Sequence, residues 1–194
     1  MKLTILGLGN PGSKYLGTRH NLGHWFVDNL AHAHNSTFQK HKEFMVSSFK
    51  WETNDILLLK SLSFMNLNGK GLTKFFCMNS NPENSLVLVQ DEMNLPLGRV
   101  KFSQGKSAGG HNGVKHVIEE IGFSPRRIRL GIRGQDEISC SLSDFVLSKL
   151  TKQEEKSFDD LFPKLYHTLH LLIFQGFSNA CNYINRYPIP APSH

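Results

Sequence analysis

Short apolar runs and helically spaced apolar residues alternate along the chain. Runs rich in Leu, Ile and Val, bounded by polar or glycine-containing segments, are typical of strands. The polar stretch Glu52-Thr53-Asn54-Asp55 separates two such runs and predicts a hairpin. The strands that this pattern predicts cover residues 2–8, 44–50, 56–62, 86–89, 100–102 and 128–132.

Helices are indicated where apolar residues recur at three- and four-residue intervals. The clearest case runs from Phe158 to Ile173 and predicts a long amphipathic helix. The helices that this spacing predicts cover residues 21–34, 67–78, 112–121 and 158–173. Strands that alternate with helices indicate an α/β sandwich, and the hairpin makes its sheet mixed.

The chain has 194 residues, which fits one domain with a full core. We expect that domain over residues 1–186 and an extended, Pro-rich tail over residues 187–194. No apolar run exceeds four residues, so no membrane span is expected. The N-terminal residues fit a first strand rather than a signal peptide. Three scattered cysteines, Cys77, Cys140 and Cys181, fit reduced thiols in the cytoplasm.

Positive charge is concentrated in one segment. Residues 99–133 hold eight Lys and Arg residues against Glu119 and Glu120, so their excess equals the net charge of +6 for the whole chain. A clustered basic surface indicates a polyanionic partner, with nucleic acid the first candidate, although a merely solvated basic face gives the same pattern.

A glycine-rich segment, Gly7-Leu-Gly9-Asn-Pro-Gly12, matches the GxGxxG pattern of dinucleotide sites directly after a predicted strand. Such a site needs a helix to open at the third glycine. Here Ser13–His20 intervenes and Pro11 removes one N–H from the loop, so we expect no dinucleotide cofactor. A nucleotide-dependent oxidoreductase stays an alternative that a dinucleotide titration tests.

Polar residues gather at the ends of the apolar segments, where ligands bind in α/β sheets. His20 can accept a proton near neutral pH, and Asp91 could hold its other ring nitrogen. None of the three cysteines lies in a glycine-rich turn and we expect no Ser or Cys nucleophile, so the pair indicates direct activation of water. Asn10, Asn66 and Asn112 could hold amide groups or an oxyanion, although Asn66 and Asn112 could equally be helix N-caps.

Metal binding is not expected. His20 and His24 lie four residues apart, but no acid or third ligand accompanies them at a suitable spacing. Singly, each of the polar residues above also has an ordinary structural interpretation.

Four motifs together resemble the bacterial peptidyl-tRNA hydrolase family. They are GLGNPGSKYLGTRHNLG (7–23), FMNLNG (64–69), QDEMNLPLG (90–98) and GGHNG (109–113), and the resemblance covers about residues 2–186. It implies a single-domain three-layer sandwich, with a twisted mixed sheet between helices, that is a cytoplasmic monomer and needs no cofactor. It implies hydrolysis of the ester between a peptide, or an N-blocked amino acid, and the 3′-terminal ribose of tRNA, which recycles tRNA from peptidyl-tRNA released by ribosomes.

The resemblance also implies residue roles. His20 matches the catalytic base, Asp91 the acid that stabilises it, and Asn10 a position that distinguishes blocked from free aminoacyl-tRNA. The positions that match contacts to substrate or tRNA are Tyr15, Phe64, Asn66, Asn112 and Arg129.

The sequence departs from the family pattern at three positions. Gln90 stands where relatives usually have His, Asn94 where a second acid often follows, and Ser103 where some relatives carry a phosphate-binding Lys. Two further alternatives remain beside hydrolysis of peptidyl-tRNA. One is a non-catalytic RNA-binding protein on the same fold, and the other is hydrolysis of a different ester or amide.

Overall fold

The computed structural model describes residues 2–76, 82–134 and 140–187. A seven-stranded sheet runs in the order β2-β3-β4-β1-β5-β7-β6. Its strands are β1 (Lys2–Gly7), β2 (Gln39–His41), β3 (Phe44–Trp51), β4 (Asn54–Ser61), β5 (Leu86–Pro96), β6 (Val100–Gln104) and β7 (Arg126–Arg133). The four central strands β4, β1, β5 and β7 are parallel, and β3 and β6 join antiparallel at the two sides. The predicted mixed sheet is confirmed.

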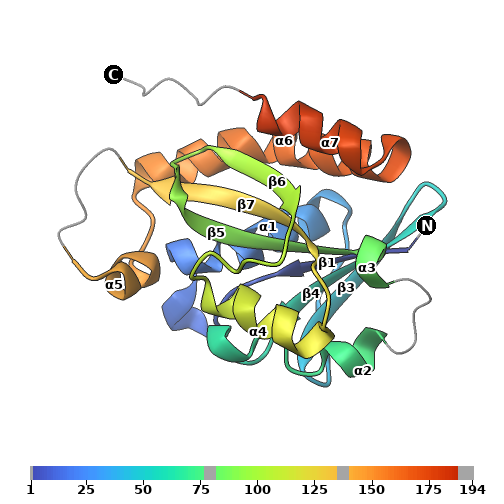
Figure 1. Ribbon diagram of the computed structural model, residues 1–194, viewed down its shortest axis with the longest axis horizontal. Helices are drawn as coiled ribbons and strands as arrows, with labels where there is room; N and C mark the ends of the chain where they lie inside the picture. The colour runs from blue at the N-terminus through green and yellow to red at the C-terminus, as the bar shows by residue number, and fades with distance from the viewer. Residues whose placement is uncertain (1, 77–81, 135–139, 188–194) are drawn as a thin grey trace.

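Helices cover both faces of the sheet, which confirms the three-layer architecture (Figure 1). The α-helices are α1 (Leu22–Ala33), α2 (Leu72–Phe76), α3 (Pro82–Ser85), α4 (Asn112–Ile121), α5 (Leu142–Leu147), α6 (Lys152–Gln175) and α7 (Phe177–Asn185). The described residues also form short 3-10 helices, namely η1 (Ser13–Tyr15), η2 (Arg19–Asn21) and η3 (Met65–Leu67). Helices α1, α6 and α7 pack on one face and α2 and α4 on the other, so each face buries its own apolar cluster.

The hairpin and the long helix are confirmed. β3 and β4 pair from Phe44↔Ser61 to Trp51↔Asn54, and α6 extends the predicted helix by six residues at its N-terminus. Thr151 and Glu154 form a capping box there, which fixes where α6 begins. In the described residues, no helix combines the length and the apolar character needed to cross a bilayer.

The helix predicted over residues 67–78 is wrong as a continuous helix. The chain forms η3, then turns, and α2 begins at Leu72. Gly71 has a φ of 85°, which a helix does not accommodate, and a Cβ on Gly69 would lie 2.8 Å from the His116 ring. Cys77 and residue 78, at the end of this predicted helix, lie outside the described residues, as do residues 188–194 of the predicted tail.

The glycine-rich segment after β1 does not open a long helix. Gly12, with a φ of 101°, precedes the three-residue η1, and α1 begins at Leu22. Gly7 instead allows close packing, because a Cβ there would lie 2.2 Å from the Gly23 carbonyl oxygen. A Cβ on Gly23 would in turn lie 2.4 Å from the carbonyl oxygen of Val89 on β5. This close approach places the start of α1, and His20 just before it, at the carboxyl end of the central strands.

Candidate active site

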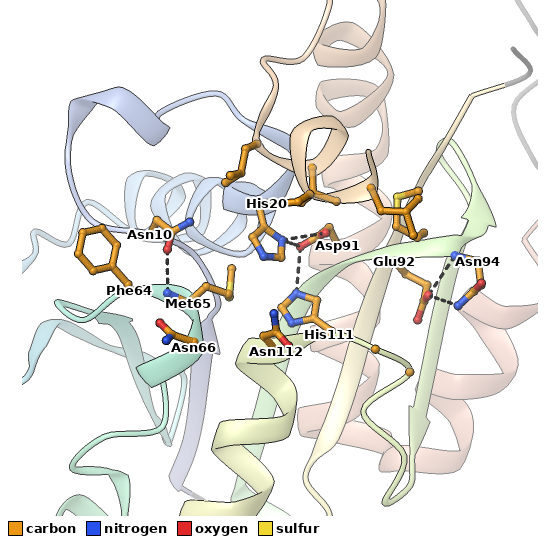
Figure 2. A pocket seen from close by; sticks show the side chains of 17 residues that line it. Asn10, His20, Phe64, Met65, Asn66, Asp91, Glu92, Asn94, His111 and Asn112 are labelled. Carbon is orange, nitrogen blue, oxygen red and sulfur yellow. Dashed lines mark hydrogen bonds and ion pairs between the residues drawn. The ribbon is translucent and has the colours of Figure 1, made fainter. Parts of the chain in front are cut away.

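His20 and Asp91 meet where η2 approaches β5. The Nδ1 atom of His20 lies 2.9 Å from one carboxylate oxygen of Asp91 and 3.1 Å from the other. Asp91 is 3% exposed and His20 is partly buried. Figure 2 shows the two side chains facing each other. The sequence placed Asp91 after a strand that ends at residue 89, but β5 continues to Pro96, so Asp91 lies within the strand. A rigid strand and a helix start therefore hold the pair.

His111 joins this pair as a third member that the sequence reasoning did not single out. Its Nε2 lies 3.1 Å from Oδ1 of Asp91, and its ring centroid is 4.9 Å from that of His20. His111 is the N-cap of α4, and its Nδ1 accepts a hydrogen bond from the Val114 N–H at 3.3 Å. The cap is thus His111 and not Asn112, which is the first residue of the helix.

The hydrogen bonds assign the protons on both rings. Because Nδ1 of His111 accepts from Val114, its Nε2 must carry the proton and donate it to Asp91. An ionised Asp91 only accepts, so Nδ1 of His20 also donates to it. The Nε2 of His20 is then left with a free lone pair on the pocket side of the ring (Figure 2). This is the arrangement that a general base requires.

Asp91 keeps its charge in this buried position. Burial alone raises the pKa of the Asp91 carboxyl, but the electrostatic attraction of the His111 ring and its hydrogen bond, together with those of His20, outweigh it. The net result holds the pKa of Asp91 well below its usual range. Asp91 is therefore ionised at neutral pH and can stabilise an imidazolium on His20.

The same three residues have one possible metal-ligand atom each within 4.8 Å of one another. A metal would need an unprotonated nitrogen from each ring. In this arrangement Nε2 of His111 and Nδ1 of His20 both carry protons toward Asp91. The hydrogen bonds thus favour a proton-transfer pair over a metal site at this cluster.

Asn10 is fixed beside His20 by the backbone of η3. Its Oδ1 accepts from the Met65 N–H at 2.7 Å, which directs its Nδ2 toward the His20 side of the pocket (Figure 2). The Asn10 backbone is held by the Asn21 side chain through two bonds of 2.8 and 2.9 Å. Buried Asn68 binds the backbone of the preceding Gly9 with two bonds of 3.0 Å. Asn10 therefore presents a preorganised amide donor.

A cavity of about 490 Å³ opens over these groups. Six of the eight predicted site residues line it, namely Asn10, His20, Phe64, Asn66, Asp91 and Asn112. Tyr15 lies beside it, packed edge-on against Phe64 with ring centroids 6.2 Å apart. Seven further wall residues stand in the quoted motifs without a predicted role, namely Met65, Glu92, Met93, Asn94, Gly109, Gly110 and His111. Helix α5 adds four that lie outside those motifs, namely Leu142, Ser143, Val146 and Leu147.

Arg129 does not line the cavity but contacts its rim. Its guanidinium lies 3.5 Å from the Glu92 carboxylate and donates to the Ser103 hydroxyl at 3.2 Å. Ser103, one of the three positions at which the sequence departs from the expected pattern, is thus a partner of Arg129. Asn94 donates to the Glu92 carboxylate from its backbone N–H and from its side-chain amide, each at 3.0 Å. An acid at position 94 would instead place a second carboxylate against Glu92. Buried Gln90 donates at 3.4 Å to the backbone oxygen of Asp91.

Similarity to known proteins extends over nearly the whole chain. A family model described as peptidyl-tRNA hydrolase matches residues 4–191. A peptidyl-tRNA hydrolase of Tolumonas auensis is 36% identical over 194 residues and covers 96% of each chain. One of Thermodesulfovibrio yellowstonii is 32% identical over 188 residues, which is 95% of this chain and 99% of the relative.

Solved structures agree with the sequence relatives. The crystal structure of peptidyl-tRNA hydrolase from Acinetobacter baumannii superposes with a TM-score of 0.88 at 30% identity, over 97% of this chain and 96% of the other. An Arg119Gln mutant of that protein gives a TM-score of 0.89 at 31% identity, with the same coverage. With the sequence motifs, the fold and the full-length matches in agreement, this chain belongs to the peptidyl-tRNA hydrolase family.

Proposed function

We propose that this protein hydrolyses the ester between a peptide, or an N-blocked amino acid, and the 3′-terminal ribose of tRNA, with His20 as the base. The observation that carries the proposal is the proton assignment, since Asp91 holds Nδ1 of His20 and leaves Nε2 free at the cavity. Membership in a family of peptidyl-tRNA hydrolases supplies the substrate class.

Water is the nucleophile in this mechanism. Nε2 of His20 takes a proton from the water as its oxygen attacks the ester carbonyl, and the buried Asp91 carboxylate stabilises the resulting imidazolium. When the tetrahedral intermediate collapses, the imidazolium returns the proton to the ribose oxygen that leaves. In the described part of the chain, Ser143 is the one hydroxyl side chain of the cavity wall, and no hydrogen bond joins it to His20. A serine nucleophile activated by His20 therefore has no support.

Amide side chains hold the ester in place. The fixed Nδ2 of Asn10 can donate to the carbonyl oxygen as negative charge develops on it. Asn112, at the first turn of α4, offers a second donor across the cavity, and exposed Asn66 can bind the peptide backbone or the terminal nucleotide. Tyr15 and Phe64 offer an aromatic edge beside them.

Phosphates of the tRNA would bind along the basic segment 99–133, with Arg129 nearest the cavity rim. Contacts to phosphate carry no sequence information and suit an enzyme that accepts every tRNA. We further propose that the protein acts as a cytoplasmic monomer, without a cofactor, with residues 1–186 as its catalytic domain.

The direct test compares N-acetyl-aminoacyl-tRNA with the unblocked aminoacyl-tRNA on the same tRNA body. We expect fast release of the blocked amino acid and slow release of the free one. No cleavage by a folded protein that still binds tRNA would identify the non-catalytic RNA-binding alternative. Equal cleavage of a short 3′-terminal fragment and of intact tRNA would identify hydrolysis of another ester.

A further inference from the structure

Arg19, the residue before His20, makes a dense set of buried contacts. Its side chain is 8% exposed and donates to the Glu154 carboxylate from Nε at 3.1 Å and from Nη2 at 2.8 and 2.7 Å. Glu154 also closes the capping box of α6, since its carboxylate accepts from the Thr151 N–H at 2.7 Å. One ion pair therefore joins the segment that carries His20 to the start of α6.

The remaining donors of Arg19 hold the C-terminal end of α5. Nη1 donates to the Ser148 hydroxyl at 2.5 Å and to the Lys149 carbonyl at 3.1 Å. The guanidinium also lies over the Phe145 ring, 4.3 Å from its centroid. The Arg19 backbone N–H donates to the Ser148 carbonyl at 3.2 Å. Helix α5 is thus attached to the residue adjacent to His20.

Helix α5 forms an apolar wall of the cavity. Leu142, Val146 and Leu147 line it, and Leu142 and Leu147 are 63% and 39% exposed. These three residues are called the α5 wall below. Large apolar side chains exposed on the wall of a cavity are typical of a ligand-binding surface.

We propose that the α5 wall binds the side chain of the esterified amino acid, and that Arg19 is a positioning residue that fixes this wall relative to His20. The proposal rests on the proposed function, because it requires an aminoacyl ester at His20. The consequence is a preference for large apolar side chains over glycine at that position of the substrate.

The charge distribution identifies the occupant. The tRNA is a polyanion, and the basic side chains of segment 99–133 lie on and around β6, α4 and β7. The α5 wall carries no charge, and the neighbouring Asp144 is bonded within α5 to Ser141. An apolar wall against a reacting ester suits the acyl side chain, while the nucleotide approaches from the basic side.

The first experiment measures kcat/KM for N-acetyl-leucyl and N-acetyl-glycyl esters on one tRNA body. We expect wild type to favour the leucyl ester about fivefold, the size expected for burial of about one methylene group. Leu142→Ala/Leu147→Ala should bring the leucyl-to-glycyl ratio close to one. Phe174→Ala is the matched control, since Phe174 is 37% exposed and lies outside the cavity. It should retain the wild-type preference.

The second experiment tests Arg19 by the same ratio. Arg19→Lys retains the positive charge but loses the bidentate hydrogen bonds to Glu154. It should lower the leucyl-to-glycyl ratio as much as Leu142→Ala/Leu147→Ala does. Combining it with Leu142→Ala/Leu147→Ala should cause no further loss, because both changes act through one wall. Arg19→Gln/Glu154→Gln leaves no unpaired buried charge and keeps a capping side chain, so it should fold and still show the lost preference.

Several outcomes would overturn the inference. An unchanged leucyl-to-glycyl ratio in folded Arg19 variants, or additive losses in the combined variant, would reduce Arg19 to a structural role. A wild type that cleaves both esters equally would exclude the α5 wall as the side-chain site while leaving the hydrolase function intact. A wild type that cleaves neither would contradict the proposed function itself.

Discussion

Asp91→Asn tests the proton assignment at the centre of the site. Oδ1 of Asp91 lies between both rings, 2.9 Å from Nδ1 of His20 and 3.1 Å from Nε2 of His111, whereas Oδ2 contacts His20 at 3.1 Å. Because Val114 locks the proton of His111 on Nε2, the oxygen of the introduced amide must occupy the Oδ1 position. The amide oxygen at Oδ1 stays near Nδ1 of His20, but the amide NH2 at the Oδ2 position, 3.1 Å from Nδ1, opposes the Nδ1 proton and favours the tautomer with the proton on Nε2.

Two losses combine in this variant. Losing a hydrogen bond to a charged group costs about 1.5–3 kcal/mol, or roughly 10- to 100-fold in rate. A proton on Nε2 also removes general-base catalysis, which is worth about 10²–10⁴-fold. Because both losses act through His20, they cannot exceed the loss of the base itself, and we expect kcat to fall by about 10²–10⁴ with little change in KM, measured on N-acetyl-aminoacyl-tRNA by single-turnover and steady-state kinetics.

The double variant Asp91→Asn/His111→Asn separates this account from a simple loss of charge. An asparagine at position 111 keeps an N-cap residue for α4 but removes the Nε2–H donor that fixes the amide introduced at position 91. That amide can then rotate and accept from Nδ1–H of His20. We expect the double variant to recover about tenfold in kcat over Asp91→Asn. A double variant slower than Asp91→Asn would refute the tautomer argument, and a single variant that alters KM alone would make Asp91 a binding residue.

Two further predictions concern binding and acid stability. Arg129→Ala should weaken tRNA binding and lower the slope of log affinity against log salt concentration by about one. The control is Lys50→Ala on β3, which removes a surface Lys paired with Asp55 and should leave the slope unchanged. Equal slopes for Arg129→Ala and wild type would place the phosphate contact elsewhere. Burial, with the charge of Lys60, lowers the pKa of His24 from 6.5 to about 3, so the folded protein keeps this ring neutral while the unfolded chain protonates it. The buried neutral ring therefore contributes its full stability above pH 6.5, and this stability is lost as the pH falls toward 3. Between pH 6.5 and 4.5 this loss is about 2–3 kcal/mol, and chemical denaturation of His24→Gln should show a much flatter pH dependence over that window. If the unfolding free energy of His24→Gln fell with pH as steeply as that of wild type, His24 would not be the source of this acid sensitivity.

The sequence was sufficient for the fold class and for most of the site, because both depend on short-range patterns. Apolar runs and helical spacing located the central strands and α6, and the four motifs contain every residue that lines the cavity except those of α5. The break between η3 and α2 was missed because it depends on the positive φ of Gly71 and on the contact of Gly69 with His116, 47 residues away.

The roles of His111 and α5 could not be predicted for a related reason. His111 stood in a quoted motif, but its contact with Asp91 exists only once α4 and β5 are side by side. Helix α5 has six residues, too few for a clear helical spacing. Its position depends on Arg19, whose partner Glu154 is 135 residues away in the sequence. Long-range polar contacts of this kind leave no local pattern.

The decisive experiment measures turnover and tRNA affinity side by side for wild type and His20→Ala. We expect His20→Ala to lose about 10²–10⁴-fold in kcat on N-acetyl-aminoacyl-tRNA while its affinity for tRNA stays within about twofold of wild type. Turnover close to wild type, or equal losses in turnover and affinity, would contradict the role of His20 as the base.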